Sequence, residues 1–128
     1  MSLLVVDKLT VGFPGHTAVH ESSFNIEAGE TLALVGESGC GKSVTAFSMM
    51  RLLPPNAVVK SGRILFDGLD LLTKTPPQMR DIRGKQISLI QQEPMTSLNP
   101  VLTIGLQIME VIRRHEKVSW KRARARAI

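Results

Sequence analysis

Residues 32–46, L-A-L-V-G-E-S-G-C-G-K-S-V-T-A, place three glycines, a lysine and a serine directly after a short apolar run. The stretch fits the pattern G-x-x-x-x-G-K-[ST], with Gly36, Gly41, Lys42 and Ser43 at the fixed positions. Glycine reaches φ values closed to other residues, so successive backbone N–H groups can point at one anion. A helix that begins here adds its unpaired N–H groups and its dipole at the same place. The spacing therefore predicts a strand, a phosphate-binding loop and a helix, in that order.

The side chains of this loop predict a nucleotide site with a metal ion. Lys42 has the reach to bridge β- and γ-phosphate oxygens, and the Ser43 hydroxyl is placed to ligate Mg²⁺. Two explanations of Cys40 stay open: a thiol made reactive by the helix N-terminus and Lys42, or a small residue tolerated in a tight loop. The predicted nucleotide-contacting residues of the loop are Gly36, Ser38, Gly39, Cys40, Gly41, Lys42, Ser43 and Val44.

The rest of the chain alternates strand and helix signals, which predicts an α/β fold. Apolar residues alternate over 3–30, whereas 31–35 and 87–91 are continuous apolar runs typical of buried parallel strands. Thr75 followed by Pro76, and Ser119 before Trp120, are typical helix starts. The predicted elements are strands within 3–30, at 31–35, at 61–72 with an Asp67-Gly68 turn and at 87–91, and helices at 42–53, from 76 to Gly84, from about 104 to 112 and from 120.

Two features of the 128-residue chain predict that it is part of a longer polypeptide. The last predicted helix runs into R-A-R-A-R-A-I without a Gly, Asn or Pro terminator. Only two segments are typical of buried parallel strands, and a doubly covered sheet normally needs more. The expected fold is thus an incomplete one.

Composition limits the class of protein. The longest apolar runs are too short to cross a bilayer, no signal peptide is evident, and one cysteine cannot form a disulfide framework, so we expect a cytoplasmic protein. The net charge of +5 lies in the tail: residues 113–128 carry seven Lys/Arg and one Asp/Glu, a balance of +6, and residues 1–112 carry nine and ten, a balance of −1. This tail is either a solvated helix face or a phosphate-binding arm.

The loop G-E-S-G-C-G-K-S, followed from Gln91 by Q-Q-E-P-M-T-S-L-N-P, resembles the ATP-binding subunits of ABC transporters. The second motif is similar to the Q-loop of the branch that serves dipeptide, oligopeptide, nickel and glutathione importers. The resemblance implies a P-loop NTPase core with an N-terminal antiparallel β subdomain and the start of a helical subdomain. It divides residues 1–128 of one ATP-binding domain into a β-rich start (1–30), a P-loop core through the Q-loop (31–94) and the start of the helical subdomain (95–128).

The same resemblance assigns two further site residues. Phe13 falls where ABC ATPases place an aromatic ring that stacks on adenine, although a strand residue packed in the core remains the alternative. Gln92 matches the catalytic glutamine that approaches Mg²⁺ and the attacking water. The implied cofactors are ATP and Mg²⁺, with Ser43 and Gln92 as metal-contacting residues. His16, His20 and His115 lack metal-ligand spacing and receive no role.

The resemblance also implies a peripheral protein at the cytoplasmic face of the cell membrane. Its expected partners are membrane-spanning permease subunits, a second ATPase subunit and, indirectly, an extracytoplasmic solute-binding protein, with nucleic acid not expected. The L-S-G-G-Q signature, the later acidic strand with its glutamate and the switch histidine do not occur in this sequence, so we expect the full-length protein to hydrolyse ATP and the 128-residue chain alone to be inactive. Two alternatives remain: a nucleotide-binding module without turnover, and an ABC ATPase that acts on nucleic acid.

Overall fold

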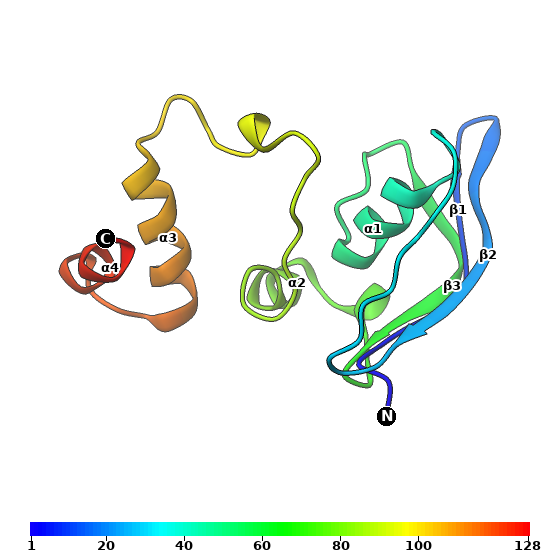
Figure 1. Ribbon diagram of the computed structural model, residues 1–128, viewed down its shortest axis with the longest axis horizontal. Coiled ribbons are helices and arrows are strands. Elements are labelled where there is room, and N and C mark those ends of the chain that lie inside the picture. The colour runs from blue at the N-terminus through cyan, green and yellow to red at the C-terminus, as the bar shows by residue number, and fades with distance from the viewer. The chain divides into compact units, whose positions relative to one another are not determined.

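The computed structural model describes residues 1–128, which form two compact units, Met1–Met79 and Arg80–Ile128. The first unit contains a four-stranded antiparallel sheet in the order β2-β1-β3-β4. The helix α1 lies over one face of this sheet (Figure 1). The elements of the first unit are β1 (Leu4–Phe13), β2 (His16–Ile26), α1 (Lys42–Met50), β3 (Val58–Phe66), β4 (Leu69–Asp70), the 3-10 helix η1 (Leu71–Thr73) and α2 (Pro76–Ile82), which continues into the second unit.

The predicted β-rich start is confirmed as a hairpin of β1 and β2. Phe13 pairs with His16 across the turn Pro14-Gly15, and Leu4 pairs with Ile26 at the other end. The predicted Asp67-Gly68 turn is confirmed too, because it joins β3 to β4. The core of this unit consists of buried apolar side chains from the sheet and the helices that cover it, namely Val6, Leu9, Val11, Val19, Met50, Ile64, Leu71 and Met79.

The two predicted parallel strands are wrong. Residues 31–35 form no strand, and Leu32, Leu34 and Val35 are 38%, 41% and 92% exposed. In 87–91 the backbone makes only an isolated bridge between Ile87 and Arg83, and Ile90 is 93% exposed. A strand exists through hydrogen bonds to a neighbouring strand, and a continuous apolar run predicts burial on both faces only where such neighbours and covering helices are present. Neither segment has them here.

The helix starts were predicted correctly, because their signals lie within a few residues. α1 begins at Lys42 as predicted, but it ends at Met50 since Arg51 takes a left-handed conformation with φ of 50° and caps it. At α2 the Thr75 N–H donates to the Gln78 side chain at 2.8 Å, which completes a capping box. The Ser119 hydroxyl accepts from the N–H of Arg122 at the start of α4.

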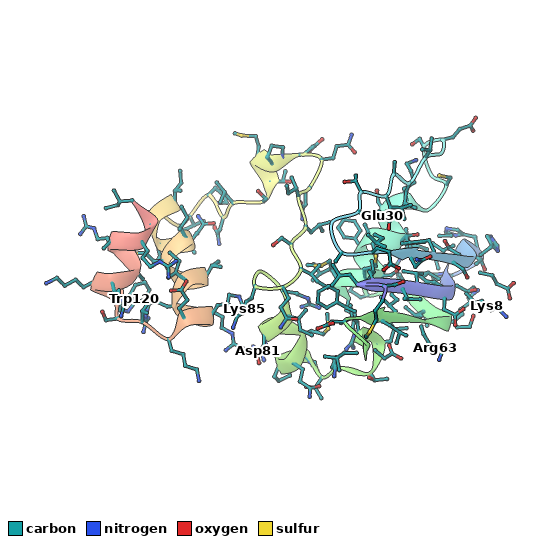
Figure 2. The ribbon with its side chains drawn as sticks, turned by 60° about the horizontal axis from the view of Figure 1, so that its bottom comes forward. Lys8, Glu30, Arg63, Asp81, Lys85 and Trp120 are labelled. Atoms are coloured by element: carbon teal, nitrogen blue, oxygen red, sulfur yellow. The ribbon has the colours of Figure 1, made fainter.

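The second unit contains the end of α2, the 3-10 helix η2 (Pro94–Thr96) and the helix pair α3 (Ile104–Glu116) and α4 (Trp120–Ala127). Ala123 is fully buried where the helices pack. The guanidinium carbon of Arg113 lies 4.2 Å from the centre of the Trp120 ring, a cation–π contact that joins α3 to α4. Figure 2 labels Trp120. Arg126 also pairs with Glu116 between the two helices. None of the helices combines the length and apolar character needed to cross a membrane.

Candidate functional site

The loop between Gly36 and Lys42 ends at an uncapped helix N-terminus. Gly41 is the N-cap of α1 and supplies no side-chain hydrogen bond to the first turn. The first N–H groups of a helix have no partner within the helix, so those at the start of α1 are available to an anion. The predicted start of a helix directly after the G-x-x-x-x-G-K-S loop is confirmed, and phosphate binding by the loop stays a prediction.

Gly41 is also the point where this loop touches the sheet. Its φ is +91°, and an added Cβ would lie under 3.0 Å from the carbonyl oxygen of Ala18 and 3.1 Å from Cγ2 of Val19. The β1–β2 register skips Ala18, since Val11 pairs with Val19 and Gly12 with Thr17, so a bulge directs this part of β2 toward the loop. Only glycine satisfies both the backbone conformation and the close approach.

Lys42 holds its ammonium group over the loop. Its Nζ donates to the carbonyl oxygens of Gly36 and Glu37, both at 2.7 Å, and lies 3.4 Å from Sγ of Cys40. The charge therefore lies within the loop that leads into the uncapped N-terminus of α1. Ser43 is exposed on the first turn of α1.

A cavity of about 360 Å³ adjoins this loop within the first unit. Its lining includes Ala18, Val19 and His20 of β2 and Cys40, Gly41 and Lys42. Thr45, which the sequence reasoning missed, is buried here and donates its hydroxyl hydrogen to the Gly41 carbonyl at 2.9 Å. This bond satisfies a carbonyl at the start of α1 and helps to fix the loop where it joins the helix.

The predicted base-contacting residue, Phe13, ends β1 at the tip of the hairpin. It is half-buried and absent from the core, and its ring stacks on that of His16 with centroids 5.2 Å apart and planes 6° apart. Sequence reasoning missed this contact. The signal that could have found it is the spacing of two ring residues around Pro14-Gly15, which makes them cross-strand partners.

The predicted catalytic residue, Gln92, lies in the second unit and is exposed between Ile90 and η2. The M-T-S-L-N-P segment after it is held by Gln107 of α3, which sequence reasoning also missed. The Gln107 amide accepts from the Asn99 N–H at 2.9 Å and donates to the carbonyls of Asn99 and Leu102 at 3.0 and 3.1 Å. One side chain thus fixes the loop that leads from Gln92 into α3.

Two carboxylates that end apolar runs have structural roles. Asp7 lies within β1 and pairs with Arg63 of β3 at 2.7 Å, and Figure 2 labels Arg63. Asp67 lies in the β3–β4 turn with a φ of +48°. Asp7 is thus a strand residue held in an ion pair, and Asp67 is a turn residue as the sequence predicts.

Comparison with known proteins identifies the class. The family model described as ABC transporter matches residues 19–128, so the chain belongs to the ABC transporter family. It is similar to the dipeptide transport ATP-binding protein DppD of Bacillus subtilis, at 52% identity over 95% of this chain and 38% of that protein. It is also similar to the oligopeptide transport ATP-binding protein OppD of the same organism (46% identity, 98% of this chain, 37% of that protein) and to the probable D,D-dipeptide transport ATP-binding protein DdpD of Escherichia coli (47%, 98% and 40%).

A solved structure supports the fold. A bacterial Atm1-family ABC exporter with ATP bound aligns with a TM-score of 0.58 at 30% identity, over 84% of this chain and 17% of that one. The resemblance to ABC ATP-binding subunits of peptide importers is therefore confirmed, as is the expected ABC ATPase fold. The chain spans 37% to 40% of the length of the three transport proteins named above.

Proposed function

We propose that this chain binds MgATP through the loop Gly36–Ser43 and the N-terminus of α1. The observation that carries the proposal is the convergence of an uncapped helix N-terminus and the Lys42 ammonium group on one loop. Backbone N–H groups of Ser38, Gly39 and Cys40 in this loop and of Val44 in the first turn of α1 would hold the phosphates, with the Cys40 N–H giving up its present bond to the Glu37 carbonyl. The family match and the ATP-bound structural relative support the same ligand.

The remaining candidate residues are those proposed to contact Mg²⁺ and the adenine base. The Ser43 hydroxyl and the Gln92 amide are oxygen donors of the kind Mg²⁺ accepts, and the Phe13 ring offers a stacking surface for adenine. A bound Mg²⁺ would neutralise part of the charge of the phosphates. Gln92 can orient a water molecule, because its amide offers both a donor and an acceptor without adding charge.

For the whole protein we propose ATP hydrolysis that drives the import of a solute, with peptides as the substrate class. The names of the similar proteins, which are dipeptide and oligopeptide transport ATP-binding proteins, support this proposal over an ABC ATPase that acts on nucleic acid. The proposed partners are permease subunits and a second ATPase subunit, with a solute-binding protein outside the membrane. The proposed location is the cytoplasmic face of the membrane.

The test is MgATP binding and turnover by the 128-residue chain, measured by calorimetry and phosphate release. Lys42→Ala should weaken MgATP binding by at least about tenfold, since it removes a charge-assisted contact to the phosphates. Lys85→Ala is the matched control, because Lys85 is an exposed lysine of the second unit (Figure 2). Equal affinities of wild type and Lys42→Ala would refute the phosphate site.

Measuring turnover separates the proposed ATP binding by this chain from the proposed ATP hydrolysis by the whole protein. We expect no hydrolysis by this chain alone, because the glutamate base and the L-S-G-G-Q segment are not in its sequence. Hydrolysis that Lys42→Ala abolishes would show that residues 1–128 contain a complete site, and the need for those segments would be refuted.

A further inference from the structure

The tip of the β1–β2 hairpin carries two stacked rings. Phe13 and His16 are cross-strand partners on either side of Pro14-Gly15, and their rings are nearly parallel, 5.2 Å between centroids and 6° between planes. This separation lies within the range of attractive aromatic pairs. His16 is exposed and Phe13 half-buried, so the pair forms a small platform at the surface.

The platform lies on the sheet face that meets the phosphate loop. Phe13 follows Val11 by two residues in β1, and the extra residue of the register shift between Val11 and Gly12, Ala18, lies in β2, so the Val11 and Phe13 side chains share a face. Val11 pairs with Val19, whose Cγ2 lies against Gly41. The ring pair and the loop are thus on the same side of the sheet.

The opposite face of the hairpin tip is already covered. Gly12 and Thr17 are partners there, and Lys60 of β3 extends across them. Its Nζ donates to the Thr17 hydroxyl at 3.0 Å, and a Cβ on Gly12 would lie under 3.0 Å from its side chain. A nucleotide base that stacks at the tip of this hairpin can therefore do so only on the sheet face that carries Phe13.

We infer that His16 is a positioning residue that prepares Phe13 to stack on a purine base; the inference rests on the proposed function. The imidazole stacks with an offset on one face of the Phe13 ring, so the base would stack on the other face. It also restricts rotation of the Phe13 side chain, so less conformational freedom is lost when a nucleotide binds. The site should accordingly favour purine over pyrimidine triphosphates, because purines offer more stacking area, while it distinguishes ATP weakly from GTP.

The binding test compares a nucleotide with its phosphates alone. His16→Ala should raise the Kd for MgATP about three- to tenfold, the range expected for loss of one aromatic pair, and leave the Kd for magnesium tripolyphosphate unchanged. His16→Phe should restore MgATP binding, because an uncharged ring can stack equally well. Asn25→Ala is the matched control, since Asn25 is an exposed residue at the far end of β2.

A spectroscopic test requires no nucleotide. The chain has three histidines, so their ring protons can be resolved by NMR. Phe13→Leu should shift the His16 ring signals downfield by removing the ring current and leave those of His20 and His115 in place. Unmoved His16 signals, or equal MgATP affinities for wild type and His16→Ala, would overturn the inference.

Different results would refute the proposed function and the inference about His16. If tripolyphosphate binds as tightly as ATP, the phosphate site stands and the base platform is refuted. If neither binds to the wild-type chain, the proposed function itself is refuted, and with it any role of His16 in nucleotide binding.

Discussion

Replacing Gly41 by alanine should destabilise the first unit more than the same change at a neighbouring loop glycine. Gly41 has a φ of +91°, and its added Cβ would meet the Ala18 carbonyl under 3.0 Å and the Val19 side chain at 3.1 Å. The left-handed conformation costs an alanine about 1–2 kcal/mol. The backbone clash adds about 1–3 kcal/mol, as overpacking typically does, because a carbonyl in a sheet cannot turn away as a side chain can.

The variant Gly39→Ala separates the cost of the left-handed conformation from the cost of the clash. Its φ is +82°, but nothing lies within 4 Å of its added Cβ. Gly39→Ala should therefore cost only the conformational part, about 1–2 kcal/mol. The difference of about 1–3 kcal/mol between the variants measures the approach of the loop to β2. For a unit of 79 residues, 1 kcal/mol lowers the thermal midpoint by about 4–8 °C.

The assay is thermal unfolding of both variants and wild type, followed by far-UV circular dichroism. The midpoint of Gly41→Ala should lie at least about 4 °C below that of Gly39→Ala. Binding of tripolyphosphate should weaken with it, since the same clash displaces the start of α1. If the two variants melt at the same temperature, the contact between Gly41 and Ala18 contributes nothing and the packing argument is wrong.

Two further changes test the helix cap and the N-terminal charge. Ser119→Ala should destabilise α4 by about 1 kcal/mol and speed amide exchange at Arg122, whereas Ser119→Asp should preserve protection; unchanged exchange in the alanine variant would contradict the cap. The hydrogen bond from Ser2 lowers the pKa of Glu27, with the N-terminal ammonium group and Asn25 as smaller causes. A carboxyl with a lowered folded-state pKa stabilises the fold above its unfolded pKa and loses that effect as the pH falls through the folded value. Between about pH 6 and pH 3 the thermal midpoint of wild type should thus fall more than that of Glu27→Gln, and parallel curves would refute the linkage.

The parts of the fold that were predictable from the sequence depend on short-range chemistry. Thr75 with Pro76 and Ser119 mark helix starts because their side chains bond to N–H groups three residues away. The Pro14-Gly15 and Asp67-Gly68 turns follow in the same way from residues that permit a tight reversal.

The parts that could not be predicted depend on partners far along the chain. The run at 31–35 was interpreted as a buried strand, yet burial requires neighbouring strands that the run itself does not specify. The position of β1 between β2 and β3 likewise depends on pairing over about fifty residues.

In the candidate site too, the features that belong to one short motif could be predicted, and the contacts between distant segments could not. The loop from Gly36 to Ser43 is one contiguous motif, so its conformation at α1 could be predicted. The close approach of Ala18 to Gly41 and the Gln107 bonds to Asn99 join segments that are apart in sequence, and no motif marks them. The stacking of His16 on Phe13 was closer to being predictable, because the two-residue turn Pro14-Gly15 already determines which residues pair across it.

The exposed segment 31–35 should make the purified chain prone to self-association in solution. T-L-A-L-V has no charge and no proline, and Leu34 and Val35 are 41% and 92% exposed, so its backbone can pair with the same segment of another molecule. Charged residues flank this segment without lying within it, because Glu30 directly precedes it and Glu37 follows it by two residues. Self-association should therefore grow with protein concentration. Dilution of the purified chain should accordingly favour the monomer.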